Sequence, residues 1–258
     1  MERFGARGKT FAGQDGLHHV SYLLQALVNE SSPILEHYAR WLQGVRAARG
    51  MCSEEMLRAL DLRPVALSAG FASVRGSWKG APVELKARAY EGGAIRYGRC
   101  IELWSGELSI GNALFLPRFD MPLPVFGLDV VAPGHGGVMV AADLSPMVPG
   151  ASIDLLRVEL PTGGELPQWC KRWFSPEALY TRLPLAELND VAEPVLARVR
   201  ALAATHPAPA PSREAEMAAA QRACCAAHLQ DDKGLGILGR MFGETWAQRF
   251  LREVMFPA

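Results

Sequence analysis

The stretch Met121-Pro-Leu-Pro-Val-Phe-Gly-Leu-Asp-Val-Val131 is apolar throughout except for Asp129. A short apolar run bounded by proline and glycine is typical of a buried or half-buried strand. A carboxylate in such a strand is costly unless it is paired, hydrogen-bonded or protonated. Because burial disfavours the charged form, we expect a raised pKa for Asp129, and a carboxyl that stays neutral near pH 7 can donate a proton. Taken alone, the pattern is more typical of a paired strand acid than of a catalyst.

The sequence on both sides of this run contains further segments of strand length, separated by turn residues. Lys79-Gly80 and Ser105-Gly106-Glu107 have the composition of tight hairpin links. Sequential strands with short links predict an antiparallel meander. The expected strands are Val65–Val74, Val83–Tyr90, Tyr97–Ser105, Leu108–Leu116, Val125–Val131 and Val138–Leu144.

Apolar residues recur at helical spacing before and after the strands, which predicts helices at both ends of the chain. The order helices, sheet, helices favours an α+β fold, a single-domain three-layer α/β/α sandwich over residues 17–258. Met1–Gly16 is polar and glycine-rich, so we expect a mobile leader there. The expected helices are Leu17–Ala48, divided at Ser32-Pro33, then Glu187–Ala204, Arg213–Leu229 and Leu235–Met255, with a stiff linker at Pro207–Pro211.

Composition excludes several classes of function. The chain has 27 Lys+Arg and 27 Asp+Glu residues, so global charge gives no argument for binding nucleic acid or an anionic membrane. Five scattered cysteines are not typical of a disulfide framework, and no metal-ligand spacing is present. No apolar stretch is long enough for a membrane span. We therefore expect a cytoplasmic protein without a metal or cluster of its own, and the absence of nucleotide, nucleophile-elbow and zinc-protease motifs removes most support for those enzymes.

Three groups of motifs together resemble the ferredoxin-dependent bilin reductases, over about half of the chain. The first is Leu123-Pro-Val-Phe-Gly-Leu-Asp129 with Ala142-Asp-Leu-Ser-Pro146. The second is Glu165-Leu-Pro-Gln-Trp169 with Phe174-Ser-Pro and Arg182. The third is Asp232-Lys233 with Phe242-Gly-Glu-Thr-Trp246 and the terminal Phe250 and Phe256.

The resemblance implies an α/β/α sandwich that reduces biliverdin IXα, the open-chain tetrapyrrole made by heme oxygenase. It also implies that a reduced [2Fe–2S] ferredoxin supplies single electrons from outside, that the enzyme binds no redox cofactor, and that the bilin carries the radical. Heme oxygenase and a phytochrome-type acceptor are further candidate partners. We expect a monomer.

The resemblance also assigns roles to individual residues. It implies that Asp129 is the main proton donor, that Glu102 assists at the D-ring vinyl group, and that Asp232 assists at the opposite face of the bilin. Lys233 matches a residue near a propionate. The resemblance also implies that Asn112 orients the chromophore. It stands where the phycocyanobilin-forming branch has a histidine, and asparagine there is typical of the branches that form phycoerythrobilin and phytochromobilin.

Arg182 and Lys233 are also candidates for a basic rim that serves the propionates or an acidic ferredoxin. The full set is Lys171, Arg172, Arg182, Lys233 and Arg240. A solvated surface is the alternative interpretation for each of them singly.

Glu102 favours a two-electron reduction of the 18-vinyl group to 18¹,18²-dihydrobiliverdin. Four-electron reduction to phycocyanobilin or phycoerythrobilin is the alternative product. A related enzyme class, the chlorophyll-catabolite reductases, and a bilin carrier without turnover are the rival functions. The retained acids argue against a carrier, which has no need of buried proton donors.

Overall fold

The computed structural model describes residues 53–105, 108–133, 137–147, 166–168, 174–176, 178–204, 208–231 and 233–257. All of them belong to one compact unit, Arg40–Ala258. The predicted leader Met1–Gly16 and the helices predicted within Leu17–Ala48 lie outside the described residues.

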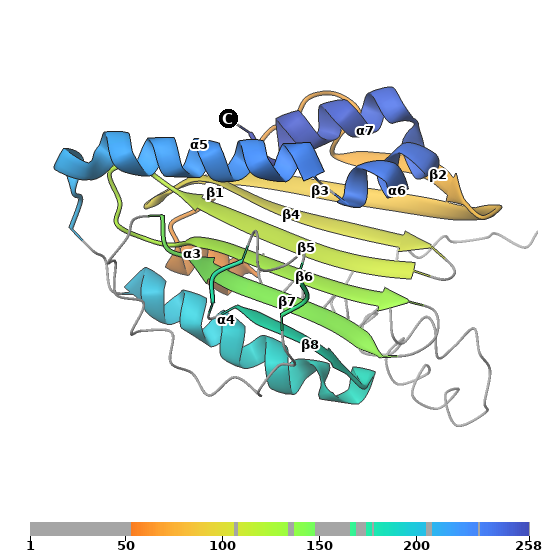
Figure 1. The fold of residues 1–258 in the computed structure, drawn as a ribbon, viewed down its shortest axis with the longest axis horizontal. Coiled ribbons are helices and arrows are strands. Elements are labelled where there is room, and N and C mark those ends of the chain that lie inside the picture. The colour runs from red at the N-terminus through yellow and green to blue at the C-terminus, as the bar shows by residue number, and fades with distance from the viewer. Residues whose placement is uncertain are drawn as a thin grey trace, which may run out of the picture. The chain divides into compact units, whose positions relative to one another are not determined.

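The unit is built on one antiparallel sheet of eight strands (Figure 1). The strand order is β1-β3-β4-β5-β6-β7-β8, and β2 pairs with β3 beside β1. Neighbours in sequence are mostly neighbours in the sheet, so the predicted meander is confirmed. The strands are β1 (Arg63–Val65), β2 (Ser73–Trp78), β3 (Ala81–Gly92), β4 (Ile95–Ser105), β5 (Leu108–Pro117), β6 (Val125–Pro133), β7 (Val138–Ser145) and β8 (Leu179–Leu183).

Turn chemistry explains where the strand predictions succeed and fail. Lys79 and Gly80 both have positive φ, at 50° and 82°, as the predicted hairpin between β2 and β3 requires. The predicted strand Val65–Val74 is wrong, because a turn around Gly70, with φ of 85°, divides it into β1 and β2. The short edge strand β8 was not predicted at all.

Helices cover both faces of the sheet, which confirms the α/β/α sandwich. On one face lie α3 (Glu54–Ala59) and, after η3 (Leu185–Glu187), α4 (Leu188–Ala204). On the other face η4 (Pro211–Arg213) leads into α5 (Glu214–Asp231), followed by α6 (Lys233–Phe242), α7 (Glu244–Phe250) and η5 (Leu251–Met255) (Figure 1). The single helix predicted over Leu235–Met255 is wrong, because Gly243, with φ of 94°, separates α6 from α7.

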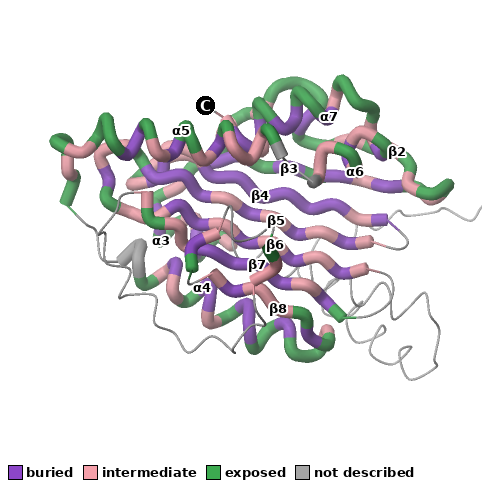
Figure 2. The backbone as a smooth tube through the Cα atoms, in the orientation of Figure 1, coloured by how far each residue is buried: buried purple, intermediate pink, exposed green. Residues whose placement is uncertain are grey.

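The two faces of β5 and β6 are buried to different extents. Ala113, Phe115, Leu128 and Val130 point toward α4, and each is at most 2 % exposed. The alternate residues, which point toward the C-terminal helices, are half-buried over the central part of both strands (Figure 2), whereas Leu116 and Val125 at one end are buried. We call this the open face; it consists of Asn112, Leu114, Gly127, Asp129 and Val131.

The cysteines do not all behave as the sequence suggested. Cys100, on β4, is disulfide-bonded. Cys224 and Cys225, on α5, are free thiols. Burial raises the pKa of Cys224 to about 11, so this thiol stays protonated near pH 7. Within the described ranges no helix is long and apolar enough to cross a membrane.

Candidate functional site

Asp129 and Asn112 are direct neighbours on the open face. They are paired residues in the ladder between β5 and β6, so their side chains project from the same side of the sheet. The Asn112 amide Nδ2 donates a hydrogen bond to Asp129 Oδ1. The two residues that the sequence analysis placed in the site are therefore joined by a hydrogen bond.

Arg99 extends this pair into a chain of three polar side chains. It lies on β4, and its side chain is on the same face as Asn112. Its Nη1 donates to Asn112 Oδ1, and its Nε donates to the carbonyl oxygen of Met255 at 2.9 Å. The guanidinium also lies over the Phe256 ring, 5.7 Å from its centroid. Sequence reasoning missed this residue, although an arginine flanked by Gly98 and Cys100 inside an apolar strand was a visible signal.

The open face has space above the sheet next to Asp129. A Cβ atom added to Gly127, two residues before Asp129 on the same face, would meet no heavy atom within 4 Å. Glycine inside a strand is typical of a place where a ligand or another backbone approaches closely. Asp129 therefore lies two residues from a position where the sheet leaves space for an added side-chain atom.

Glu102 is not part of this group. It pairs in register with Gly111, so its side chain points to the α4 face, away from Asn112 and Asp129. It is 5 % exposed, and Arg88 Nη2 donates to its carboxylate at 2.7 Å. The structure does not bring Glu102 together with Asp129, and the role predicted for it at the D-ring vinyl group stays a prediction without geometric support here.

The remaining predicted residues are placed only in part. Asp232 lies outside the described residues, between α5 and α6, and Lys233 is the first residue of α6. Arg182 is exposed on the edge strand β8 and projects from the same face as Asp129, since its register partner Met139 pairs with Val131.

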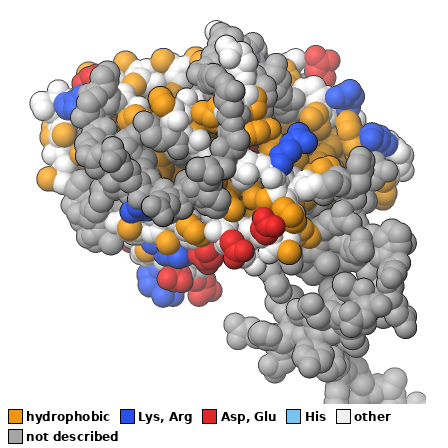
Figure 3. Space-filling model, turned by 60° about the horizontal axis from the view of Figure 1, so that its bottom comes forward, with side chains coloured by type: hydrophobic (Ala, Val, Ile, Leu, Met, Phe, Trp, Pro, Cys, Tyr) orange, Lys and Arg blue, Asp and Glu red, His pale blue; other side chains and the backbone are white. Residues whose placement is uncertain are grey.

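The predicted basic rim is likewise incomplete. Arg240 is exposed and lies over the Trp78 ring, 5.4 Å from its centroid. Lys171 and Arg172 are outside the described residues. Charges of both signs are scattered among hydrophobic side chains on the face drawn in Figure 3.

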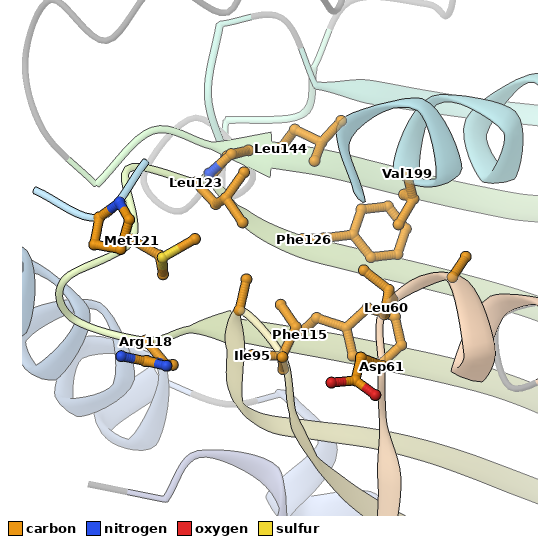
Figure 4. A pocket seen from close by; sticks show the side chains of 15 residues that line it. Leu60, Asp61, Ile95, Phe115, Arg118, Met121, Leu123, Phe126, Leu144 and Val199 are labelled. Atoms are coloured by element: carbon orange, nitrogen blue, oxygen red, sulfur yellow. The ribbon is translucent and has the colours of Figure 1, made fainter. Parts of the chain in front are cut away.

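A cavity of about 390 Å³ lies on the α4 side of the sheet, not on the open face (Figure 4). Apolar side chains such as Ile95, Phe115 and Phe126 line it. Arg118, at its edge, donates to both carboxylate oxygens of Asp120. The Asn112–Asp129 pair faces the other side, so we do not place the site chemistry in this cavity.

Two titratable groups near the hydrogen-bonded series Arg99–Asn112–Asp129 are neutral at pH 7. Burial raises the pKa of Tyr97 to about 12, and its hydroxyl donates to the carbonyl of Val254 at 2.8 Å. Burial and, to a lesser extent, the charge of Arg99 lower the pKa of His228 to about 4. The His228 ring is stacked on Phe256, with centroids 4.8 Å apart. Arg99 thus supplies fixed positive charge in a region where Tyr97 and His228 carry none.

A half-buried carboxyl that accepts a hydrogen bond from an amide is suited to giving or taking a proton. Among the described residues no group of three or more His, Cys, Asp and Glu side chains is placed to hold a metal ion. The fold and the site together place a hydrogen-bonded carboxyl group on the face of an antiparallel sheet that lies toward the C-terminal helices.

The chain belongs to the ferredoxin-dependent bilin reductase family, whose model matches residues 51–257. It is 28 % identical over 231 residues to the phycoerythrobilin:ferredoxin oxidoreductase of Synechococcus sp. RCC307, covering 78 % of this chain and 86 % of the relative. It is also 28 % identical to the phycocyanobilin:ferredoxin oxidoreductase of Gloeobacter violaceus, covering 76 % and 83 %.

Among solved structures, the fold is similar to that of tomato phytochromobilin synthase, crystallised in complex with biliverdin. The TM-score is 0.64 at 20 % identity, over 79 % of each chain. The family resemblance inferred from the motifs is therefore confirmed, and the protein is an oxidoreductase that uses ferredoxin as an external electron donor.

Proposed function

We propose that this protein reduces biliverdin IXα with single electrons from a reduced [2Fe–2S] ferredoxin, and that Asp129 delivers a proton to the bilin. The observation that carries the proposal is the position of Asp129: half-buried, bonded to Asn112, and beside the open space over Gly127. Similarity to a protein crystallised with biliverdin supports the choice of substrate.

Reduction of a bilin requires a proton donor held in a fixed position, and Asp129 on the open face is such a group. Reduction of one bilin double bond consumes two electrons and two protons, and a one-electron donor makes a bilin radical unavoidable. A conjugated bilin has several positions that can accept a proton, so the donor must be held at one of them. A strand residue hydrogen-bonded to its cross-strand neighbour is held more firmly than a residue on a loop. Asp232 remains the proposed donor at the opposite face of the bilin, and Lys233 and Arg182 the proposed contacts of its propionates.

Glu102 and Asn112 favour different reduction products. Glu102 was the reason to predict two-electron reduction of the 18-vinyl group to 18¹,18²-dihydrobiliverdin, and its side chain points to the α4 face. Asn112 beside Asp129 favours the second candidate, reduction of the kind carried out by the branches that form phycoerythrobilin and phytochromobilin. Four-electron reduction to phycocyanobilin is a further outcome that the assay would recognise.

The test is an anaerobic reaction of purified protein with biliverdin IXα and reduced ferredoxin, followed by absorbance and product chromatography. We expect consumption of biliverdin through a transient radical absorbance and one dominant reduced bilin. Asp129→Asn should still bind biliverdin but reduce it about 10²- to 10⁴-fold more slowly, the usual contribution of a positioned proton donor. A stable protein–biliverdin spectrum that reduced ferredoxin does not change would instead show a bilin carrier.

A further inference from the structure

Arg99 is a charged side chain with an unusual degree of burial. It is 1 % exposed and is one of the largest fully buried side chains among the described residues. Burial of a guanidinium is costly unless hydrogen bonds replace its water. Arg99 obtains such bonds from the Met255 carbonyl and from Asn112, and it adds a contact with the Phe256 ring.

The chemistry of arginine determines the orientation of the Asn112 amide. A guanidinium can only donate hydrogen bonds, so it must face the Asn112 oxygen, Oδ1. The amide nitrogen is then turned toward Asp129, and its N–H group donates to Asp129 Oδ1. With a neutral partner in place of Arg99, the amide could rotate by 180° and present its oxygen to Asp129 instead.

We propose that Arg99 is a positioning residue for bilin reduction, which acts on Asp129 through Asn112 and does not touch the bilin. This inference rests on the proposed function of Asp129 as proton donor. Arg99 keeps Asn112 as a hydrogen-bond donor to Asp129, and its positive charge favours the carboxylate that forms when Asp129 gives up its proton. Arginine cannot be deprotonated in this pH range, so Arg99 supplies charge but no proton.

The proposed role of Arg99 predicts the direction in which the titration of Asp129 moves when Arg99 is replaced. Asp129 must be protonated to act as a donor, so activity falls as pH rises through its ionisation. Removing the charge of Arg99 disfavours the carboxylate, so Asp129 should keep its proton to higher pH, by on the order of one pH unit. The alkaline limb of the activity profile should move upward by the same interval, and reduction below that limb should slow because Asp129 has become a weaker acid.

Arg99 also fastens the C-terminal segment, and a control must separate this from the proposed role. Tyr97 provides it, because its hydroxyl donates to Val254 from the same face of the same strand. Tyr97 lies two residues from Arg99 and makes none of the hydrogen bonds in the chain from Arg99 to Asp129. Tyr97→Phe therefore weakens the attachment of η5 and leaves the Arg99–Asn112–Asp129 chain intact.

The deciding experiment is an infrared pH titration of the protonated Asp129 carboxyl in the intact protein, with the band assigned by its loss in Asp129→Asn. The variants are Arg99→Gln, Arg99→Lys, Tyr97→Phe, Asn112→Ala and the double variant Arg99→Gln/Asn112→Ala. We expect Arg99→Gln and Asn112→Ala to move the titration upward, and Arg99→Lys to restore most of the original position. We also expect Tyr97→Phe to leave it unchanged. The double variant should shift no further than Arg99→Gln, which already loses both the charge and the fixed orientation of the amide.

The inference is overturned if Arg99→Gln titrates like the unmodified protein, or if Tyr97→Phe produces the same shift. If Arg99→Gln does not fold, Asn112→Ala decides, because an unmoved titration in that variant excludes action through the amide. The same variants are then assayed for the pH dependence of biliverdin reduction. An unmodified protein that does not reduce biliverdin would overturn the proposed function alone, since the infrared titration needs no turnover.

Discussion

Arg88 and Glu102 form an ion pair of 2.7 Å on the α4 face of the sheet, opposite to the face that carries Asp129. The Glu102 side chain is 6 % exposed, whereas that of Arg88 is 43 % exposed. A buried carboxylate that loses its charge partner is strongly disfavoured, so the pair has a structural role whether or not Glu102 has another one.

Replacement of Glu102 by glutamine therefore has an expected outcome in each of two measurements. We expect the free energy of unfolding to fall by about 1–3 kcal/mol, because a charge-assisted hydrogen bond is lost in a buried position. We expect the chromatographic profile of bilin products to be unchanged, because Glu102 faces away from Asp129. Arg88→Gln is the matched control for stability. Selective loss of a vinyl-reduced product in Glu102→Gln would restore the role predicted from the motif.

Gly127 permits a direct test of whether the bilin lies on the open face. A Cβ at this position meets nothing within 4 Å, so Gly127→Ala should fold normally and keep bilin binding within a few-fold. Gly127→Leu should also fold, because its side chain enters open space, but it should weaken biliverdin binding by tenfold or more through steric exclusion. Thermal unfolding and a biliverdin absorbance titration of both variants measure this. Equal biliverdin affinity in all three proteins would show that the bilin binds elsewhere.

The sequence was sufficient to predict β6 and the position of Asp129 within it, because a single carboxyl in an apolar strand is a local signal. It was not sufficient to decide between Arg99 and Glu102 as a neighbour of Asn112. These two residues are three apart on one strand and so must lie on opposite faces. Which of them faces Asn112 depends on the register across the β4–β5 hairpin, and a shift of one residue would exchange them.

Other features escaped prediction for reasons of the same kind. The strand β8 is only five residues long, so its sequence contains too short an alternation of apolar and polar residues to predict a strand. Its position in the sheet is determined by pairing with β7. The break at Gly243 interrupts helical spacing that is otherwise continuous from α6 into α7. The open space over Gly127 depends on where the C-terminal helices pack, which no local pattern specifies.

Asp143, the register partner of Gly127 on β7, provides a prediction about stability. It is 6 % exposed on β7 and accepts hydrogen bonds from the Ser175 backbone N–H at 2.8 Å and the Ser175 hydroxyl at 2.6 Å. Asp143→Ala leaves a buried N–H without its acceptor, so we expect a loss of about 2–4 kcal/mol in urea unfolding. Asp190→Ala, an exposed acid in the first turn of α4, should change stability by less than about 1 kcal/mol. Similar small effects in both variants would contradict this role of Asp143.

His228 makes the stability of the protein depend on pH in a defined window. Its pKa is lowered from 6.5 to about 4, first by burial and second by the charge of Arg99. Between these two values the unfolded chain binds a proton that the folded protein does not. The stability that the neutral His228 provides is therefore complete above pH 6.5, and it is lost progressively as the pH falls toward 4.

The expected loss across this window is at most about 3 kcal/mol, from a shift of this size. Other carboxyl groups also titrate below pH 5, so the informative quantity is the difference between the unmodified protein and His228→Gln in urea unfolding at pH 4.0, 5.0, 6.0 and 7.5. Glutamine cannot be protonated in this range, so the variant should gain stability relative to the unmodified protein as the pH is lowered.

Because Arg99 is the second cause of the shift, Arg99→Gln should reduce that relative gain as well. A difference that stays constant from pH 7.5 to 4.0 would mean that His228 can be protonated in place, and that its stack on Phe256 tolerates the charge.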